Sequence, residues 1–568
     1  MKILKKKKHT GAQLLVECLE AHGVKYVFGI PGAKIDSVFD ALVDSKIQLI
    51  HCRHEQNAAF MAGAYGRITG QPGVVLVTSG PGVSNLATGL LTATTEGDPI
   101  VAFGGNVKRS MALKESHQAA NNAKLLEAAT KFSIEINTPE NIPEAVANAF
   151  RISKKPRAGA TFISLPQDIV SNETAIKANP VTPDLSLGAA KDSLITQTLA
   201  LLKKSKLPVL LLGQEASRPD CTQAIRALLQ EIPIPVVGTY QAAGVISREL
   251  RDTCFFGRVG LFKNQPGDLL LDAADLVITI GYNPAEYDPE IWNTGKAAQS
   301  RPLIHLDYLP SNLHTTYLPA VELVGDIPDT LTHLQTALRS AFAKKAQDHW
   351  VANPALVKIK AKITALKKAQ HRSKSKTGKI HPLDFIEQLS ASIDDNTRVI
   401  SDIGSHYMWL ARYLYSYEPH HLLFSNGQQT LGVSLPWAMA SLLAEPKKTV
   451  ISISGDGGFL FSGVELETAV REKLKVIHFV WDDQSYNMVG EQQVMKYKRD
   501  SGVHFGPVDF VQFAESLGAK GFHLKKAEDL PALLKKIHKI QGPVVIQVPI
   551  NYADNPTLFK DLNANIGN

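Results

Sequence analysis

The sequence predicts an α/β protein with three doubly wound domains, each built on a parallel sheet. Short apolar strands alternate with amphipathic helices in three stretches of the chain, a pattern typical of parallel sheets. Segments with little periodicity separate these stretches, and the first and third stretches repeat the same order of strand, turn and helix at similar length. We therefore expect two related domains around a middle domain.

The first domain is expected over residues 11–180, after a basic tail at 1–10. One helix near residues 12–22 opens it, and a second helix begins at Gln56. Its strands are expected at 26–29, 47–52, 73–78, 99–103 and 160–165. Residues 171–191 are rich in Pro, Asn, Ser and Ala, which predicts a linker.

The middle and third domains continue the alternation. The middle domain is expected over 192–345, with strands at 208–212, 236–239, 276–280, 303–307 and 322–324. A basic, helical linker at 346–380 leads to the third domain at 381–555, and a tail follows at 556–568. Strands of the third domain are expected at 398–401, 449–454, 476–481 and 544–548.

Charge and composition exclude several classes of protein. The 568 residues include 61 Lys and Arg against 54 Asp and Glu, which leaves a net charge of +7. Basic residues cluster at 5–8 and 358–379 without the interleaved aromatic residues of a nucleic-acid surface. No apolar run reaches the roughly 18 to 20 residues of a membrane span, and the start lacks a secretory signal. Four cysteines without a CxxC pair fit core thiols in the cytoplasm.

A carboxylate follows each of two buried strands in the third domain. Asp456 lies in Gly455-Asp456-Gly457-Gly458, and Asp483 follows the next expected strand. The 27 residues between them (483 − 456) fit one βαβ crossover. Mg²⁺ commonly takes one or two carboxylates plus phosphate oxygens, and glycines let the backbone approach a diphosphate. The pattern predicts a magnesium diphosphate site, although an isolated Gly-Asp-Gly can also be a simple tight turn.

Glu55 follows the expected strand at 47–52 and stands where a helix of small residues begins, including Ala58, Ala59 and Gly63. This placement alone is typical of a glutamate that stabilises a helix N-terminus. A carboxylate close to a cofactor would also suit proton transfer.

These motifs resemble those of the thiamine diphosphate-dependent enzyme superfamily, whose signature is GDG followed one crossover later by Asn or Asp. The resemblance implies that Asp456, Asp483 and the carbonyl of Ser485 bind Mg²⁺. It also implies that Glu55 bonds the aminopyrimidine ring of a cofactor held by another subunit, and hence a homodimer or homotetramer. The usual Asn-Asn pair reads Asp482-Asp483 here, which keeps an oxygen ligand but adds negative charge.

Longer runs resemble the acetolactate synthases over nearly the whole chain: FGIPGAKID at 28–36, RHEQNAAFMAGAYGRITG at 53–70, TSGPGVSNL at 78–86 and SNGQQTLGVSLPWAMA at 425–440. The resemblance implies two doubly wound cofactor domains that flank a Rossmann-like middle domain. It implies Leu431 as an apolar wedge that bends the cofactor, although Leu431 could also be a core leucine. The implied cofactor-binding residues are Glu55, Pro81, Asn85, Gln428, Gln429, Leu431, Gly455, Asp456, Gly457, Gly458, Asp483, Tyr486, Asn487 and Met488. The implied catalytic residues are Glu55, Gln118 and Gly32, and the implied substrate residues are Lys34, Gln118 and Gln492; Lys108 and Arg109 could also attract the substrate carboxylate, or lie on the surface.

Two departures favour the catabolic, flavin-free branch of this family. The biosynthetic enzymes carry Trp where this chain has Gln492, and a GARFDDR-like stretch where this chain reads GYNPAEYDP at 281–289. The GRVGL run at 257–261 is shared by both branches and does not decide the matter. Pyruvate decarboxylases carry a double His near the site, whereas His420 and His421 are expected in a surface loop.

The resemblance thus implies condensation of two pyruvate molecules to 2-acetolactate with release of CO₂, through hydroxyethyl-thiamine diphosphate, on the way to acetoin and butanediol. Thiamine diphosphate and Mg²⁺ are the expected cofactors, FAD is not expected, and neither nucleic acid nor a membrane is an expected partner. The alternatives are a biosynthetic acetohydroxyacid synthase or another thiamine diphosphate-dependent 2-keto acid decarboxylase or oxidase. A nucleic-acid-binding protein is supported only by the +7 charge.

Overall fold

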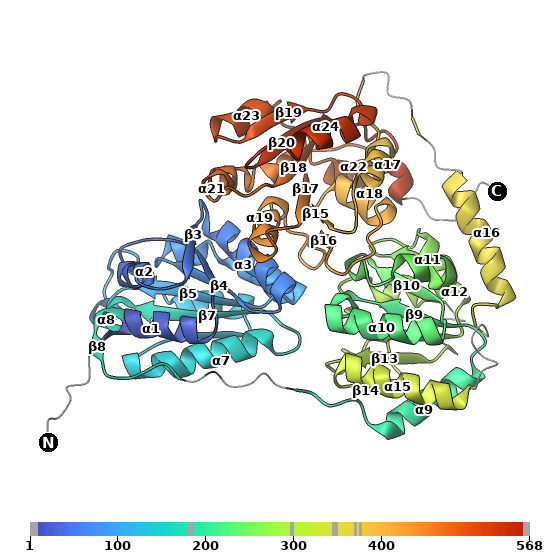
Figure 1. Cartoon of the computed structure of the whole chain (residues 1–568), viewed down its shortest axis with the longest axis horizontal. Coiled ribbons are helices and arrows are strands. Elements are labelled where there is room, and N and C mark those ends of the chain that lie inside the picture. Colours follow the sequence, from blue (N-terminus) through green and yellow to red (C-terminus); the bar gives the residue numbers. More distant parts are fainter. Residues whose placement is uncertain are drawn as a thin grey trace.

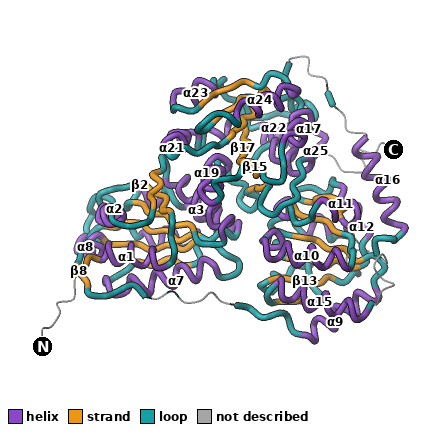
Figure 2. Tube along the Cα trace, viewed as in Figure 1, coloured by secondary structure: helices purple, strands orange, loops and turns teal. Residues whose placement is uncertain are grey.

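The computed structural model describes residues 9–179, 181, 186–295, 300–342, 350–368, 372–373 and 378–559. Three six-stranded parallel sheets, each flanked by helices, form three lobes that follow one another along the chain (Figure 1). In Figure 2 the strands lie inside each lobe and the helices outside. The predicted fold class is confirmed.

The N-terminal sheet has the strand order β3-β2-β4-β5-β7-β6. Its strands are β2 (Tyr26–Ile30), β3 (Gln48–His51), β4 (Gly73–Val77), β5 (Ile100–Asn106), β6 (Phe132–Glu135) and β7 (Ala160–Pro166). Its helices are α1 (Gly11–Ala21), α2 (Asp36–Val43), α3 (Glu55–Thr69), α4 (Pro81–Ser84), α5 (Ala87–Glu96), α6 (Asn122–Leu126), α7 (Ile142–Lys154) and α8 (Gln167–Ser171). β1 (His9–Thr10) pairs antiparallel with β8 (Glu173–Thr174), so residues 9–10 of the predicted tail and 173–174 of the predicted linker are paired.

The C-terminal sheet has the order β16-β15-β17-β18-β20-β19. Its strands are β15 (Thr397–Ser401), β16 (Leu422–Phe424), β17 (Thr449–Gly455), β18 (Ile477–Asp482), β19 (Lys520–His523) and β20 (Val544–Pro549). Its helices are α17 (Pro382–Ser392), α18 (Ser405–Tyr413), α19 (Ser434–Ala444), α20 (Asp456–Phe459), α21 (Leu466–Arg471), α22 (Asn487–Tyr497), α23 (Phe510–Ser516), α24 (Leu530–Ile537) and α25 (Pro556–Phe559). When the strands of each domain are counted in chain order, both terminal sheets read 2-1-3-4-6-5, so the two domains share one topology.

The middle sheet has the order β11-β10-β9-β12-β13-β14, which reads 3-2-1-4-5-6 and is the Rossmann order. Its strands are β9 (Pro208–Leu212), β10 (Val236–Thr239), β11 (Phe255–Val259), β12 (Leu276–Ile280), β13 (Leu303–Asp307) and β14 (Val321–Val324). Its helices are α9 (Asp192–Lys204), α10 (Pro219–Glu231), α11 (Arg248–Cys254), α12 (Pro266–Ala273), α13 (Pro289–Trp292) and α15 (Ile327–Ala341), and α16 (Pro354–Lys368) follows in the basic stretch.

The two terminal domains pack directly on each other through α3 and α19, which lie side by side (Figure 1). One apolar core extends across this contact, because buried residues of both helices, such as Ala62 and Ala438, belong to the same cluster. α3 can pack closely because it is rich in Ala and Gly: a Cβ on Gly66 would lie 2.4 Å from the Pro99 carbonyl oxygen. Two domains far apart in sequence therefore share one apolar core.

Besides the two-residue strands β1 and β8, four strands escaped the sequence prediction, and all four lie at the edges of their sheets: β6, β11, β16 and β19. Edge strands need not be apolar on both faces, unlike the central strands of a parallel sheet. β6 and β19 are only partly buried along their length, and β16 has three residues. β6 and β19 therefore lack the continuous buried run that identified the others; β16 is apolar but short, and Gly257 and Arg258 interrupt the apolar residues of β11.

The sequence also predicted the state of the cysteines, a tail at each end of the chain and the absence of a membrane span. The four cysteines are free and buried, as predicted for core thiols. Residues 556–559, placed in the predicted tail, form α25, and Leu558 is buried against the body of the chain. The cluster Lys5 to Lys8 lies outside the described residues. Across the described part of the chain, no helix is both long and apolar enough to cross a membrane.

Candidate active site

Asp456 stands at the carboxyl end of β17, where the chain turns into α20, and is 1% exposed. Its Oδ1 accepts the amide of Gly457 at 2.8 Å. Its Oδ2 accepts the amides of Asp483 at 3.2 Å and Gln484 at 2.5 Å, both from the end of the neighbouring strand β18. The structure therefore brings the two predicted strand ends together.

The pair of acids carries unfavourable negative charge. Burial, followed by the charge of Asp483, raises the pKa of Asp456 to about 7, and burial raises that of Asp483 to about 6. The Ser485 hydroxyl donates to Asp483 Oδ2 at 2.7 Å. Among the described residues no group of three or more His, Cys, Asp or Glu could hold a metal ion. A cation here would therefore need these two carboxylates together with carbonyl, phosphate or water oxygens, a donor set that fits Mg²⁺.

In the turn around Asp456, a side chain at Gly457 would displace the Tyr486 ring, whereas one at Gly458 would only reach contact distance of Asp402. A Cβ on Gly457 would lie 2.5 Å from the Tyr486 ring, and a Cβ on Gly458 would lie 3.4 Å from the carboxylate carbon of Asp402. Gln484 holds a left-handed backbone with φ 62°, which is uncommon for a side chain of this type and recurs at functional sites. Asp456, Gly457 and Gly458 are buried, and glycines in such a turn allow the close approach of a diphosphate to the backbone.

The sequence prediction missed the residues that follow β15. Asp402 is fully buried, and its carboxylate accepts the amide of Gly432 at 2.9 Å and that of Ile403 at 2.8 Å; burial raises its pKa to about 7. Ser405 donates to Asn487 Oδ1 at 2.8 Å. The signal was present, because polar residues end a third parallel strand at the same edge of the sheet. This signal was missed because the spacing of residues along the sequence does not reveal which strands are neighbours in the sheet.

The predicted cofactor run lies next to this edge. Gln428 is exposed and donates to Thr95 Oγ1 at 2.9 Å, while Gln429 has φ 50°. Leu431 is partly buried and packs against the C-terminal core, so its two predicted roles are compatible. Tyr486 is exposed beside Gly457. On α22, Met488 packs on the core and Gln492 is exposed.

A second group of predicted residues gathers at the carboxyl edge of the N-terminal sheet. Glu55 is the first residue of α3 and is half-buried, and Asn85 Nδ2 donates to its Oε2 at 2.9 Å. A Cβ on Gly82 would lie 3.6 Å from Glu55 Oε1, and a Cβ on Gly32 would lie 2.6 Å from Thr78. The glycine turn at residues 80–82 thus forms a wall beside Glu55. Pro81 in this turn is exposed.

Gln118 faces the same turn. Ser79 Oγ lies 3.4 Å from Gln118 Oε1, a Cβ on Gly80 would lie 3.3 Å from Gln118 Cβ, and the Gln118 backbone is left-handed with φ 63°. Lys34 is half-buried and its carbonyl packs near Gly105.

Of the two remaining basic candidates, Arg109 is not available to a substrate carboxylate. Its Nε donates to Asp168 at 2.8 Å. Lys108 is exposed.

The site residues therefore form two groups, one around Asp456 and one around Glu55. No hydrogen bond between described residues joins the groups directly. Each group lies at the carboxyl edge of its sheet near the point where strand order reverses, which is where open α/β sheets bind ligands.

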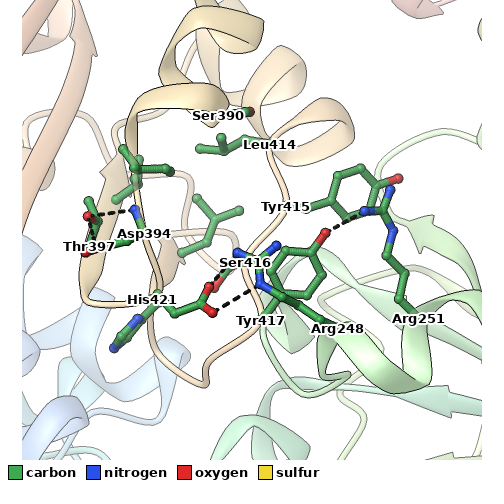
Figure 3. A pocket seen from close by; sticks show the side chains of 14 residues that line it. Arg248, Arg251, Ser390, Asp394, Thr397, Leu414, Tyr415, Ser416, Tyr417 and His421 are labelled. Atoms are coloured by element: carbon green, nitrogen blue, oxygen red, sulfur yellow. Dashed lines mark hydrogen bonds and ion pairs between the residues drawn. The ribbon is translucent and has the colours of Figure 1, made fainter. Parts of the chain in front are cut away.

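A cavity of about 180 Å³ lies elsewhere, at the seam between the middle and C-terminal domains (Figure 3). The arginine side chains that line it are bonded within the chain. Nε and Nη2 of Arg248 donate to the Asp395 carboxylate, and Nη1 of Arg251 donates to the Tyr417 hydroxyl. No predicted site residue lines it. His421 does, and it is 7% exposed, so the expectation that His420 and His421 lie on the surface is wrong for His421; His420 is half-buried.

Comparison with known proteins places the whole chain. Three family models match in order: the thiamine pyrophosphate enzyme N-terminal TPP binding domain at residues 9–125, the central domain at 195–334 and the C-terminal TPP binding domain at 402–548. An acetolactate synthase of Bacillus subtilis is 50% identical over 98% of this chain and 95% of its own length. A catabolic acetolactate synthase of Raoultella terrigena is 44% identical over 97% of each chain, and the acetolactate synthase isozyme 2 large subunit of Escherichia coli is 30% identical over 96% of each. The chain therefore belongs to the acetolactate synthase family of thiamine diphosphate-dependent enzymes.

Proposed function

We propose that this protein condenses two molecules of pyruvate to 2-acetolactate and CO₂, with thiamine diphosphate and Mg²⁺ and without flavin. The paired carboxylates Asp456 and Asp483 at the carboxyl edge of the C-terminal sheet carry the proposal, because two neighbouring buried carboxylates provide oxygen ligands whose mutual repulsion a bound Mg²⁺ would relieve. The similarity to a catabolic acetolactate synthase over nearly the full length supports the choice of reaction.

Thiamine diphosphate, when bound, supplies a thiazolium ring that accepts the electrons released by decarboxylation. Asp456, Asp483 and the Ser485 carbonyl would hold Mg²⁺. The turn at Gly455, Gly457 and Gly458 and the first turn of α22, with Asn487 and Met488, would hold the diphosphate. Gln428, Gln429 and Leu431 would hold the aminopyrimidine end.

Glu55 would move a proton at a ring nitrogen of the aminopyrimidine, as a positioned carboxylate can. The hydrogen bond from Asn85 orients its carboxylate, and the 80–82 turn excludes water from one side. Gln118, Gln492 and Lys34 would hold substrate, with Gly32 leaving room beside them. Among these, Gln118 has the best placement, because it faces the Ser79–Gly80 turn.

The middle domain does not fit a flavin. Its crevice at the switch point between β9 and β12 is filled by Glu286, which is 3% exposed. The Glu286 carboxylate accepts the amides of Gln214 at 3.1 Å and Asn283 at 2.9 Å, and the Thr239 hydroxyl at 2.5 Å. These donors are the kind that would bind a dinucleotide phosphate. A carboxylate of the chain itself occupies them, which supports flavin-free activity.

The separation of the two residue groups supports an active site shared between subunits. Gly427 and Gln428 bond Glu96 and Thr95, and Glu96 pairs with Arg67 near the C-terminal end of α3. Glu55 lies at the opposite end of α3, about 18 Å away at 1.5 Å per residue. One aminopyrimidine ring cannot contact both within one chain. A second copy would supply the missing half.

Exposed apolar side chains support the same assembly. Leu460, Phe461 and Val464, which follow the Gly-Asp-Gly-Gly turn, are 44 to 49% exposed, and Val489, Val494, Met495 and Tyr497 are exposed on α22. Apolar residues gathered on a surface mark interaction sites. We infer a homodimer or homotetramer, located in the cytoplasm.

The decisive experiment is incubation of the purified protein with pyruvate, thiamine diphosphate and Mg²⁺. Acid decarboxylation of the product should yield acetoin, with no dependence on added FAD. Pyruvate supplied with 2-ketobutyrate separates the alternatives: dominant acetohydroxybutyrate would indicate a biosynthetic synthase, and acetaldehyde or acetate alone a decarboxylase or oxidase. A yellow protein that loses activity when flavin is removed would contradict the flavin-free assignment.

A further inference from the structure

A buried glutamate of the C-terminal domain contacts the turn that presents Glu55. Glu465 lies nine residues after Asp456 (465 − 456), just before α21, and is 0% exposed. Its Oε1 accepts the amides of Arg53 at 2.9 Å and His54 at 3.1 Å, and the side-chain amide of Asn57 at 3.1 Å. The Thr468 hydroxyl donates to its Oε2 at 2.8 Å.

These hydrogen bonds involve backbone amides at the start of α3, where an amide has no acceptor within the helix. His54 is the N-cap residue of α3, and its ring accepts only the amide of Gln56. Arg53 and His54 precede the first residue of α3, and the Glu465 carboxylate accepts from both of their amides at the positive end of the helix dipole. The two residues immediately before Glu55 are thus held by a different domain of the same chain.

A half-buried acid on the same segment behaves differently. Glu467 is 37% exposed in its side chain and reaches Arg53 only at 3.9 Å. It contacts no backbone amide of the 53–54 turn in the hydrogen bonds of the described residues. It therefore provides a matched control two positions away.

We propose that Glu465 is a positioning residue that sets the orientation of Glu55, and through it the proton transfer assigned to Glu55. The inference rests on the proposed function of Glu55. A geometric displacement of about 1 Å at a catalytic group can cost about 10²-fold in rate. Loss of the Glu465 carboxylate should therefore slow proton transfer more than it weakens cofactor binding.

The first test compares Glu465→Leu, Glu465→Gln and Glu467→Gln in the full-length protein. Without cofactor, amide hydrogen exchange in a peptide covering residues 52–58 should accelerate in Glu465→Leu and stay near wild type in Glu467→Gln. With saturating thiamine diphosphate and Mg²⁺, exchange of the thiazolium C2 proton should slow tenfold or more in Glu465→Leu, at a cofactor Kd within about threefold of wild type. Glu465→Gln, which keeps an oxygen acceptor, should recover most of the rate.

C2 exchange at the wild-type rate in Glu465→Leu would overturn the inference even if the melting temperature falls, because a purely structural role affects stability alone. If Glu465→Leu does not fold, the shorter Glu465→Asp replaces it, and a wild-type rate of C2 exchange together with unchanged amide protection at 52–58 in Glu465→Asp overturns the inference as well. A wild-type protein that shows no C2 exchange, or a Glu55→Gln variant that exchanges normally, would instead refute the proposed function.

Mixed subunits then decide which domain Glu465 serves. If it acts on Glu55 of its own chain, Glu465→Leu subunits should regain activity when mixed with Asp456→Ala subunits but not with Glu55→Gln subunits. The opposite pattern would mean that Glu465 acts on the cofactor turn of its own domain, and would overturn the inference. The pair Glu55→Gln with Asp456→Ala reports separately on whether the site is shared.

Discussion

Glu55 and Asp456 are both carboxylates at strand ends, yet their surroundings differ. Glu55 is half-buried and bonded by one neutral amide, Asn85. Asp456 is buried, accepts three backbone amides and lies beside a second acid, Asp483. The first arrangement holds a lone carboxylate through one neutral donor, and the second places two carboxylates together, as a divalent cation would require.

Replacement of Glu55 by Gln should leave cofactor binding near wild type and slow C2 proton exchange by orders of magnitude, because the amide cannot exchange the proton. Deuterium exchange followed by NMR after an acid quench measures it. Near-normal exchange would reject the assigned role.

Asp456→Ala should abolish Mg²⁺-dependent retention of thiamine diphosphate on gel filtration, because one of two carboxylate ligands is lost. Asp482→Asn is the control: Asp482 Oδ2 accepts from Gln547 at 2.6 Å, and an Asn oxygen can do the same. Retention by Asp456→Ala equal to that of Asp482→Asn would refute the metal assignment.

At the scale of elements, the two terminal domains place chemistry at equivalent positions of one topology. Glu55 and the run at 427–432 follow the second strand of their sheets. The turns at Gly80 and Asp456 follow the third, and Gln118 and Asp483 follow the fourth. Parallel strands end at one edge of a sheet, so loops after successive strands converge. The functions diverged while the positions stayed the same.

The end of α22 offers a test of element stability. Lys498 caps this helix with a left-handed backbone of φ 62°, which glycine adopts without strain. Lys498→Gly should raise the free energy of unfolding by about 1 kcal/mol, whereas Lys496→Gly within the helix should lower it by about 1 kcal/mol. Thermal melting followed by circular dichroism distinguishes them. A melting temperature of Lys498→Gly below that of the wild type would contradict the assignment of backbone strain to Lys498.

The filled crevice of the middle sheet should make stability depend on pH. Burial raises the pKa of Glu286 from 4.5 to about 7. The folded state therefore binds this proton more tightly than the unfolded state, and the stabilisation is present at low pH and lost as pH rises through about 7. The Glu286→Gln variant has no carboxyl group to titrate at this position. Its free energy of unfolding relative to that of the wild type should therefore increase between about pH 5 and pH 8. Melting curves across that range measure the difference in stability between variant and wild type. A difference that does not change with pH would contradict the raised pKa of Glu286. The control is Glu290→Gln at an exposed neighbouring position, whose stability relative to wild type should not change with pH.

At the scale of the whole molecule, the contact between α3 and α19 places residues 427–432 at the end of α3 opposite to Glu55 of the same chain. Neither Glu55→Gln nor Asp456→Ala alone should be active. Mixed and refolded or co-expressed together, they should recover activity, because some mixed dimers contain one intact site. Acetoin assays on tagged and separated mixed dimers measure the recovery, and its absence would contradict a site shared between subunits.

The sequence by itself predicted the central strands, because strands buried on both faces are continuous apolar runs. The spacing also placed Asp456 and Asp483 at the ends of two strands and Glu55 at a strand-to-helix junction, while their roles were implied by the resemblance to thiamine diphosphate-dependent enzymes and stay predictions. The edge strands β6 and β19 were missed, because a half-exposed strand has no such run. Only the tertiary structure revealed Asp402 beside Gly458, Glu286 in the Rossmann crevice and Glu465 beneath Glu55. Each is a buried carboxylate whose partners lie elsewhere in the chain, and only folding brings acceptor and amides together.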